Sequence, residues 1–321
     1  MVITRTPLRI SFVGGGTDLP AYYLHSRKPG IVLSATIDKY VYIMLNEKFD
    51  GKVRVSYSKT ENTELFEEVQ HELVRETMAY FGIKSGLEIV SVADIPGSGS
   101  GLGSSSAFTV GLIKAIGHYE GVLYNNYQLA EFACEIEMFR CSKFCGKQDQ
   151  YAAAFGGMNQ FTFYEDERVG VNKFTNWNTL SGIQESLLLF YLGPRKDKTI
   201  LERQHNNASD HFDKLESMGD LVEELVDEIN EYPCQLGQYL DINWEYKRQL
   251  AEGISNDNIQ KIYQRAMEAG ANGGKVLGQG GGGFMLFHAS PKNHQSVIDA
   301  VGLAKVPFNF STKGSEVIHA S

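Results

Sequence analysis

The feature that most constrains this chain is the run PGSGSGLGSSSA at 96–107, which has four glycines and five serines in twelve positions. The segment 87–94 before it alternates apolar residues as a strand does, and the segment 108–119 after it has apolar residues at helical spacing. The run is therefore predicted to be the turn between a strand and the N-terminus of a helix. At such a terminus the first N–H groups lack partners and the helix dipole is positive, so the turn can hold an anion.

A flexible connector is the plain alternative for a stretch rich in glycine and serine. Here the glycines stand at every second position from 97 to 103, so alternate residues lack a Cβ and a ligand can approach the backbone closely. The serines fall at the helix start, where hydroxyls can cap the helix, bind phosphate or reach a metal ion. A phosphate-binding loop is the better interpretation. Its candidate residues are Pro96, Gly97, Gly99, Gly101, Leu102, Gly103, Ser104, Ser105 and Ser106.

The loop differs from the two common nucleotide-binding loops. It lacks the lysine of a Walker loop, and it does not contain G-x-G-x-x-G. The segment GQGGGG at 278–283 matches that second pattern formally, but FMLFH follows it and is predicted to be a strand. A dinucleotide fingerprint must open a helix, so this segment does not indicate a Rossmann site.

Composition limits the class of protein. A chain of 321 residues, 42% hydrophobic and 21% charged, fits roughly two globular domains. No apolar stretch approaches the ~18 residues of a membrane span, and the N-terminus lacks a signal-peptide pattern, so no membrane partner is expected. The four cysteines lack zinc-type spacing and fit reduced thiols in a cytoplasmic protein. A net charge of −9 argues against nucleic acid as a partner.

Strands and helices are mixed along the chain, which favours an α+β fold over a doubly wound sheet. The pattern changes at about residue 180, so the predicted domains are 1–180 and 181–321, with the possibility open that the last strand returns to the first domain. Asn125 or Asn126 is the expected cap of one helix. The expected elements include strands at 7–13, 36–45 and 52–59 and helices at 64–81 and 127–140.

Two aspartates follow glycines at points where a ligand and the backbone can meet. In RISFVGGGTD at 9–18, Asp18 can accept hydrogen bonds from the paired hydroxyls of a sugar, and the alternative is that it caps a turn. In GKQDQYAAAFGG at 146–157, Asp149 lies two residues from Lys147, an arrangement that surface residues also show. Neither aspartate identifies a site by itself.

Glu137 lies at the edge of a predicted apolar helix face, where a carboxylate needs a partner. A salt bridge to Arg140 is the plain explanation. The functional one is coordination of Mg²⁺ together with the hydroxyl of Ser105.

Taken together, these stretches resemble the GHMP family of small-molecule kinases. Pro96 and the segment GLGSS at 101–105 resemble its ATP-binding motif, PLRISFVGGGTD at 7–18 its N-terminal motif, and GQGGGGF at 278–284 its C-terminal glycine motif. The resemblance is strongest to the branch that acts on D-glycero-D-manno-heptose 7-phosphate, which shares PLRISF-GGGTD and GKQDQYAAAFGG. Gln279 departs from the alanine of many members, which leaves the details of that loop open.

The resemblance implies a two-domain fold, with an N-terminal domain like domain 2 of ribosomal protein S5 and a ferredoxin-like C-terminal domain. It also implies transfer of the γ-phosphoryl group of ATP, with Mg²⁺, to the anomeric hydroxyl of the heptose 7-phosphate, giving the 1,7-bisphosphate. Another sugar of the galactose, fucose or mannose type, or a heptose 1-phosphate, stays open as the acceptor. So does a non-catalytic ATP and sugar sensor, and a homo-oligomer is possible.

The same resemblance assigns residue roles. Ser105 and Glu137 match the Mg²⁺ ligands, and Asp149 matches the residue that orients or deprotonates the acceptor hydroxyl. Lys147 is expected to keep Asp149 ionised, and Arg9 matches a cation near the transferring phosphoryl group. Arg195 in GPRKDKT is our candidate for a phosphate grip remote from the transfer site. The expected substrate-binding residues are Gly16, Thr17, Asp18, Asp149, Arg195, Gly281 and Gly282.

Overall fold

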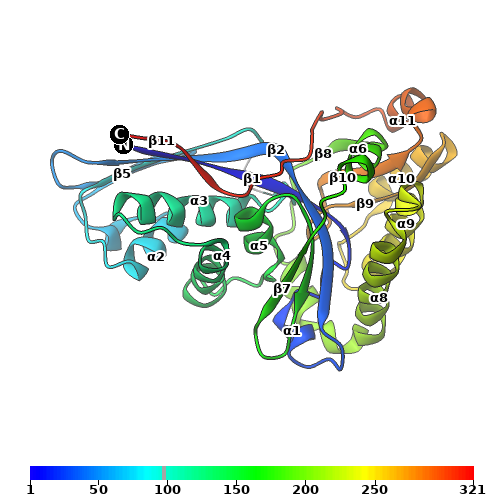
Figure 1. The fold of residues 1–321 in the computed structure, drawn as a ribbon, viewed down its shortest axis with the longest axis horizontal. Helices are drawn as coiled ribbons and strands as arrows, with labels where there is room; N and C mark the ends of the chain where they lie inside the picture. The colour runs from blue at the N-terminus through cyan, green and yellow to red at the C-terminus, as the bar shows by residue number, and fades with distance from the viewer. Residues whose placement is uncertain (96–98) are drawn as a thin grey trace.

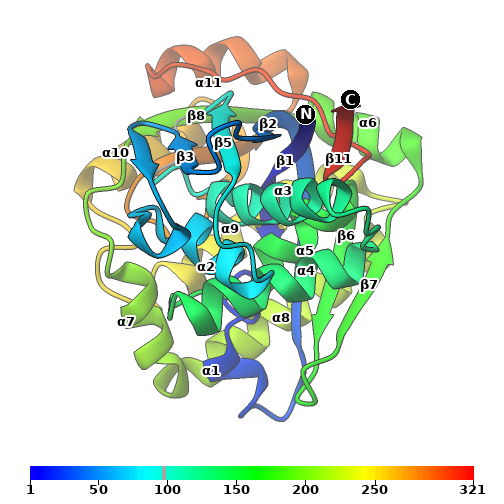
Figure 2. The ribbon, with the colours of Figure 1, turned by 90° about the vertical axis from the view of Figure 1, so that its left-hand side faces the viewer.

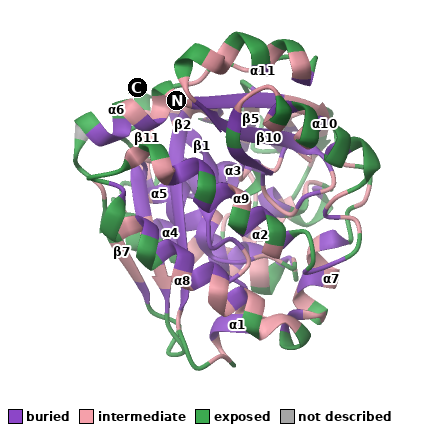
Figure 3. Ribbon diagram, turned by 90° about the vertical axis from the view of Figure 1, so that its right-hand side faces the viewer, coloured by how far each residue is buried: buried purple, intermediate pink, exposed green. Residues whose placement is uncertain are grey.

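The computed structural model describes residues 1–95 and 99–321. Its largest unit is an eight-stranded sheet in which β11, β1, β2, β5, β3 and β4 follow one another, while β6 pairs with β2 and β7. The long apolar strands β1 and β2 form the buried centre of this sheet (Figure 3). The strands are β1 (Val2–Val13), β2 (Gly30–Glu47), β3 (Val53–Ser56), β4 (Thr60–Thr63), β5 (Leu87–Ala93), β6 (Met158–Phe163), β7 (Val169–Lys173) and β11 (Glu316–Ala320).

Helices from the first half of the chain gather on one face of this sheet (Figures 1 and 2). They are α2 (Glu72–Tyr80), α3 (Ser104–Tyr119), α4 (Asn126–Cys134) and α5 (Gln148–Phe155). The mostly apolar helix α3 is buried along nearly its whole length and packs against β1 and β2. Its N-terminus is thereby fixed next to the end of β1, which positions the glycine loop.

The second half of the chain forms a smaller antiparallel sheet with the order β8, β10, β9. Helix α9 packs against β9 and α8, and both α8 and α9 contact the large sheet, so the two halves share one hydrophobic core. The elements are β8 (Leu187–Gly193), β9 (Ala271–Val276), β10 (Gly283–Ala289), α8 (Phe212–Glu228), α9 (Leu236–Lys247) and α10 (Asp257–Glu268). The shorter helices are α1 (Pro20–Tyr23), α6 (Trp177–Glu185), α7 (Ile200–Asn206) and α11 (His294–Val301).

The two ends of the chain lie side by side (Figure 1). After α11 the chain crosses back to the large sheet, and β11 pairs antiparallel with β1. The last strand therefore lies with the N-terminal strands, as the sequence had left open. Along the chain, the change from the large sheet to the small one falls between β7 and β8. The exact domain boundary near residue 180 stays a prediction.

The mixed helices and sheets confirm the α+β class, and two predicted helices differ in detail. Only part of 64–81 is α-helical, because a short 3₁₀ turn at Phe66–Glu68 precedes α2. The segment 127–140 begins as α4, with Asn125 as its cap in a capping box, and continues as a π-helix over Glu135–Arg140. No helix in the described part of the chain is long and apolar enough to cross a membrane.

Candidate active site

A cleft of about 250 Å³ opens where the first half of the chain meets the second. The first half contributes the end of β1, the glycine loop with the start of α3, and the segment before α5. The second half contributes residues after β8, part of α7, the end of α9 and the turn between β9 and β10. Segments far apart in the sequence therefore form one cavity.

The glycine loop has the backbone conformation that its alternating glycines predict. Gly99, Gly101 and Gly103 all have left-handed φ angles, of 75°, 77° and 76°, which cost a residue with a Cβ about 1–2 kcal/mol. Gly103 is the N-cap of α3, and among the residues that the structure describes no side chain caps this end. The free N–H groups of the first turn therefore lie at the cleft.

Most of the predicted phosphate-binding residues line the cleft. They are Gly99, Gly101, Gly103, Ser104, Ser105 and Ser106. Leu102 is fully buried instead, and its carbonyl accepts the backbone N–H of Arg9 at 3.0 Å, which joins the loop to β1. Pro96 and Gly97 lie outside the described residues.

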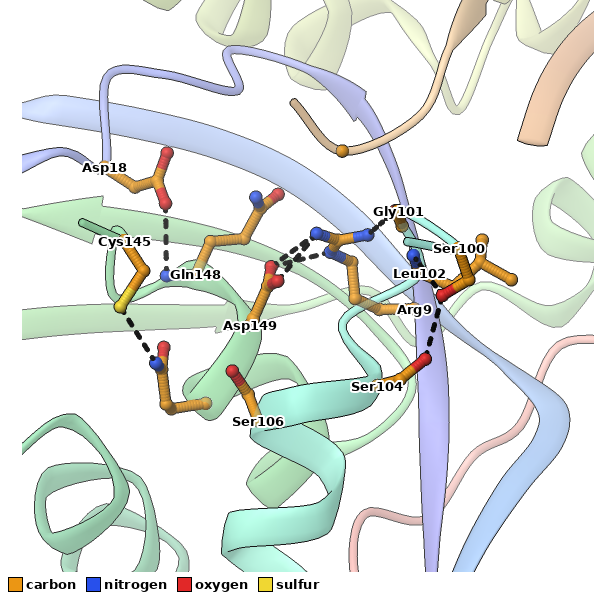
Figure 4. A network of polar contacts seen from close by, with 12 residues as sticks. Arg9, Asp18, Ser100, Gly101, Leu102, Ser104, Ser106, Cys145, Gln148 and Asp149 are labelled. Carbon is orange, nitrogen blue, oxygen red and sulfur yellow. Dashed lines mark hydrogen bonds and ion pairs between the residues drawn. The ribbon is translucent and has the colours of Figure 1, made fainter. Parts of the chain in front are cut away.

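Arg9 and Asp149 form an ion pair at the centre of the cleft (Figure 4). Nε of Arg9 donates to Oδ1 of Asp149 at 2.7 Å and Nη2 donates to Oδ2 at 2.8 Å, while Nη1 donates to the carbonyl of Gly101. This two-point contact fixes the carboxylate and leaves a lone pair on each of its oxygens for another donor. Arg9 thus connects the glycine loop to the proposed catalytic aspartate.

Asp18 lies on the side of Asp149 opposite to the glycine loop (Figure 4). Its carboxylate accepts the N–H of Gly16 at 2.9 Å and the N–H of Gln148 at 3.4 Å. Burial raises the pKa of the Asp18 carboxyl, and the nearby charge of Asp149 acts in the same direction. Gly16 and Asp18 line the cleft, whereas Thr17 is fully buried and bonds the backbone of Gly14 and Ile31.

Glu137 and Ser105 come together at the floor of the cleft. The buried Glu137 carboxylate accepts hydrogen bonds from the hydroxyls of Ser105 and Ser106 and from Nε2 of Gln150. Its nearest cation is Lys143, with Nζ 3.9 Å from Oε1, and Arg140 does not pair with it among the described residues. The predicted alternative of a Glu137–Arg140 salt bridge is therefore wrong.

This pair fits Mg²⁺, which is usually held by one or two protein oxygens together with substrate phosphates and water. The described residues contain no cluster of three His, Cys, Asp or Glu side chains that would hold a metal ion without a ligand. The buried carboxylate next to a hydroxyl at the phosphate loop supplies the two oxygen donors that such an ion needs.

Arg195 does not lie where we expected it. Its backbone and Cβ lie against Gly99, and its guanidinium lies beside Gly101, where an added Cβ would be 3.4 Å from Nη2. It therefore belongs to the glycine loop and is not remote from the transfer site. Gly281 and Gly282 do not line the cleft among the described residues; a Cβ at either would press on the residues around Arg195.

Lys147 also differs from its predicted role. Its ammonium bonds the carboxylate and carbonyl of Glu167, and Arg9, rather than Lys147, provides the ion pair to Asp149. Lys147 is therefore a residue that fixes the segment before α5 in place. Sequence proximity to Asp149 was misleading, because neighbours on a helix point in different directions.

Lys247, which belongs to none of the sequence motifs, lines the cleft from the end of α9. Burial, followed by the charge of Arg9, lowers the pKa of the Lys247 ammonium to about 8. A signal was available, because Lys247 falls at helical spacing on the face that carries Leu236 and Leu240, which is buried in the structure. A lysine on the buried face of a helix indicates a function more strongly than one on a solvated face.

Family models for the N-terminal and C-terminal domains of GHMP kinases match residues 65–157 and 234–305. Over 320 residues, the chain is 33% identical to D-glycero-alpha-D-manno-heptose 7-phosphate kinase from Campylobacter jejuni, covering 93% of this chain and 92% of that protein. The chain belongs to the GHMP kinase family.

Two further proteins show the breadth of this likeness. The kinase is 27% identical over 309 residues to a mevalonate kinase from Thermococcus onnurineus, covering 86% of this chain and 87% of that protein. The crystal structure of a D-glycero-D-manno-heptose 1-phosphate kinase from Bacteriodes thetaiotaomicron has the same fold, with a TM-score of 0.81 at 23% identity over 100% of both chains. The two-domain GHMP kinase fold is thereby confirmed, and the enzyme takes its phosphoryl group from ATP.

Proposed function

We propose that this kinase transfers the γ-phosphoryl group of ATP to the anomeric hydroxyl of D-glycero-D-manno-heptose 7-phosphate, giving the 1,7-bisphosphate. The observation that carries the proposal is the Arg9–Asp149 pair, which lies between a phosphate loop on one side and Asp18 on the other. The relative named for the same acceptor supports the choice of sugar, because its similarity extends over nearly the whole of both chains.

The glycine loop and the start of α3 are proposed to hold the ATP phosphates through backbone N–H groups. Phosphoryl transfer has a loose transition state, so the site must mainly position the reactants and neutralise charge. Arg9 supplies positive charge beside Asp149, and Arg195 supplies it beside Gly101. With the charge neutralised by these two residues, phosphoryl transfer requires no strong base.

Asp149 is the proposed acceptor of the hydroxyl proton. As the sugar oxygen bonds to the γ-phosphorus and the bond to ADP breaks, the proton passes to a carboxylate oxygen that Arg9 holds in position. A positioned base of this kind contributes roughly 10²–10⁴-fold to a rate. An anomeric hydroxyl is more acidic than an ordinary alcohol, which eases the proton transfer.

Ser105 and Glu137 are the proposed Mg²⁺ ligands. The ion, when bound, would neutralise charge on the phosphate oxygens. Ser106 and Gln150 also donate to Glu137 and would keep its carboxylate oriented toward such an ion.

The test is a turnover assay with ATP and Mg²⁺ against a panel of sugars and sugar phosphates, with phosphorus NMR of each product. The panel contains mannoheptose 7-phosphate, mannoheptose 1-phosphate, galactose, fucose and mannose. We expect turnover of mannoheptose 7-phosphate, with a new phosphorus signal coupled to the anomeric proton.

Turnover of another sugar alone would keep the kinase mechanism and overturn the proposed acceptor. Binding of ATP without turnover of any acceptor would overturn the catalytic proposal and favour a sensor.

A further inference from the structure

Lys247 is a buried cation in the cleft, and the described part of the chain supplies it with no anionic partner. Its ammonium donates to the carbonyl of Gly278, which uses one of three N–H groups. Within residues 1–95 and 99–321, no carboxylate oxygen lies within 4.0 Å of Nζ. Because burying a charge is costly unless it is paired, such an ammonium in an open cleft indicates that the ligand supplies the anion.

Two other buried polar atoms of the cleft also lack partners among the described residues. They are Oγ of Ser11 and Oε1 of Gln148, and both side chains are more than nine-tenths buried. A Cβ added to Gly15 would lie 3.3 Å from Ser11 Oγ and 3.9 Å from Lys247 Nζ, so the hydroxyl and the ammonium border the same space. Gln148 is also the residue whose backbone N–H donates to the carboxylate of Asp18. These groups form a polar subsite prepared for a ligand.

The glycines that border each cation place Lys247 nearer to the acceptor end of the cleft than Arg195. Arg195 lies against Gly99 and Gly101 of the phosphate loop, whereas Lys247 borders Gly15, in the turn that leads to Asp18. The turn at Gly278, to which Lys247 donates, rests on Gly101, so Lys247 lies between the two ends and not beyond them. Three cations already serve the phosphate loop, since Arg9 donates to Gly101, Arg195 borders Gly101 and Lys143 donates to Ser105. Among the described residues that line the cleft, Lys247 is the cation left for the acceptor.

We propose that Lys247, with Ser11, binds an anionic phosphate ester carried by the acceptor sugar. This inference rests on the proposed sugar kinase function and replaces Arg195 with Lys247 as the group that recognises the substrate's own phosphate. A phosphate monoester carries nearly two negative charges near neutral pH and three acceptor oxygens. It would satisfy the free donors of Lys247 and the hydroxyl of Ser11 together. A neutral sugar would leave the buried charge uncompensated.

The test compares Lys247→Met with the unmodified kinase, using each phosphorylated acceptor that the panel identifies and its dephosphorylated form. Methionine keeps the length of the side chain and removes its charge. We expect the KM for the phosphorylated acceptor to rise roughly tenfold to a hundredfold, because a buried charged hydrogen bond is lost. The KM for the neutral sugar and the dissociation constant of ATP, measured by calorimetry, should change less than about threefold. Lys247→Arg should recover most of the acceptor affinity.

Lys275→Met is the matched control. Lys275 is another fully buried lysine nearby, but its ammonium donates to the carbonyl of Phe12 and it does not line the cleft. Its substitution removes a buried charge without removing a proposed ligand contact. The KM ratio between phosphorylated and neutral sugar should therefore stay unchanged.

Three results would overturn the inference while leaving the kinase function intact. They are a panel in which only neutral sugars are phosphorylated, equal effects of Lys247→Met on both acceptors, and a loss of ATP affinity alone, which would assign Lys247 to the nucleotide. If no acceptor turns over, the proposed function fails by itself. Calorimetric binding of mannoheptose 7-phosphate to the unmodified kinase and to Lys247→Met then decides the role of Lys247.

Discussion

Asp149→Asn keeps the shape of the side chain and removes the charge that Arg9 holds in place. We expect kcat to fall by roughly 10²–10⁴-fold, because the amide cannot take the hydroxyl proton. ATP binding should persist, since the nucleotide is held by the loop and the start of α3. Steady-state kinetics and calorimetry with ATP measure the two effects separately.

Asp166→Asn is the control for that substitution, because Asp166 is an exposed aspartate that pairs with Arg168. It should leave kcat unchanged. Near-normal turnover of Asp149→Asn would remove Asp149 from its assigned role.

Single residues also show how far the sequence could predict this site. Motif order identified Asp18, Asp149, Glu137 and Ser105, and the structure brings all four to one cleft. Motif order could not show which cation pairs with Asp149, because Arg9 and Lys147 are both candidates in the sequence. Only the packing of β1 against α5 decides between them. That choice depends on contacts between residues 140 positions apart.

At the scale of elements, the glycine loop depends on both its backbone angles and its close packing. A Cβ at Gly101 would lie 2.6 Å from the carbonyl oxygen of Leu277, and the residue has a φ of 77°. Gly101→Ala therefore adds a collision to the strain of about 1–2 kcal/mol that a left-handed alanine carries. We expect a larger loss in the free energy of unfolding than that strain alone, together with weaker ATP binding. Urea unfolding measures the free energy of unfolding, and calorimetry measures the binding of ATP.

Gly82→Ala provides a control with strain alone. Gly82 has a φ of 70°, and no atom of the described residues lies within 4 Å of an added Cβ. The free energy of unfolding of Gly82→Ala should fall only by the cost of the backbone strain, and its affinity for ATP should stay unchanged. Equal losses of stability and affinity in the two variants would contradict the packing argument.

Local sequence predicted the elements around that loop because their signals are local. The apolar alternation of β5 and the helical spacing of α3 are properties of neighbouring residues. The π-helix that carries Glu137 does not follow the usual helical period, and it packs against α2 and α3, which local sequence does not reveal. Helical periodicity therefore placed Glu137 on the right segment without giving its orientation.

At the scale of the whole molecule, the cleft depends on β1, which connects the N-terminus of the chain to the site. β1 pairs with β2 along its length, and at its other edge its first residues pair with β11. Arg9 lies beyond the part that β11 covers and is opposite Thr36 of β2. The pairing of β1 with β11 could not be predicted from the sequence, because it joins segments more than 300 residues apart.

Deletion of residues 316–321 should therefore separate stability from function. It removes the β11 ladder and the ion pair between Arg5 and Glu316, while Arg9, Asp149 and the glycine loop keep all their partners. We expect a loss of roughly 2 kcal/mol in the free energy of unfolding, from a few hydrogen bonds at about 0.5–1.5 kcal/mol each. The KM values for ATP and acceptor, measured well below the melting temperature, should not change. Full stability of the truncated kinase would contradict the expected contribution of β11 to folding, and a changed KM for ATP would show instead that β11 helps to set the position of Arg9 along β1.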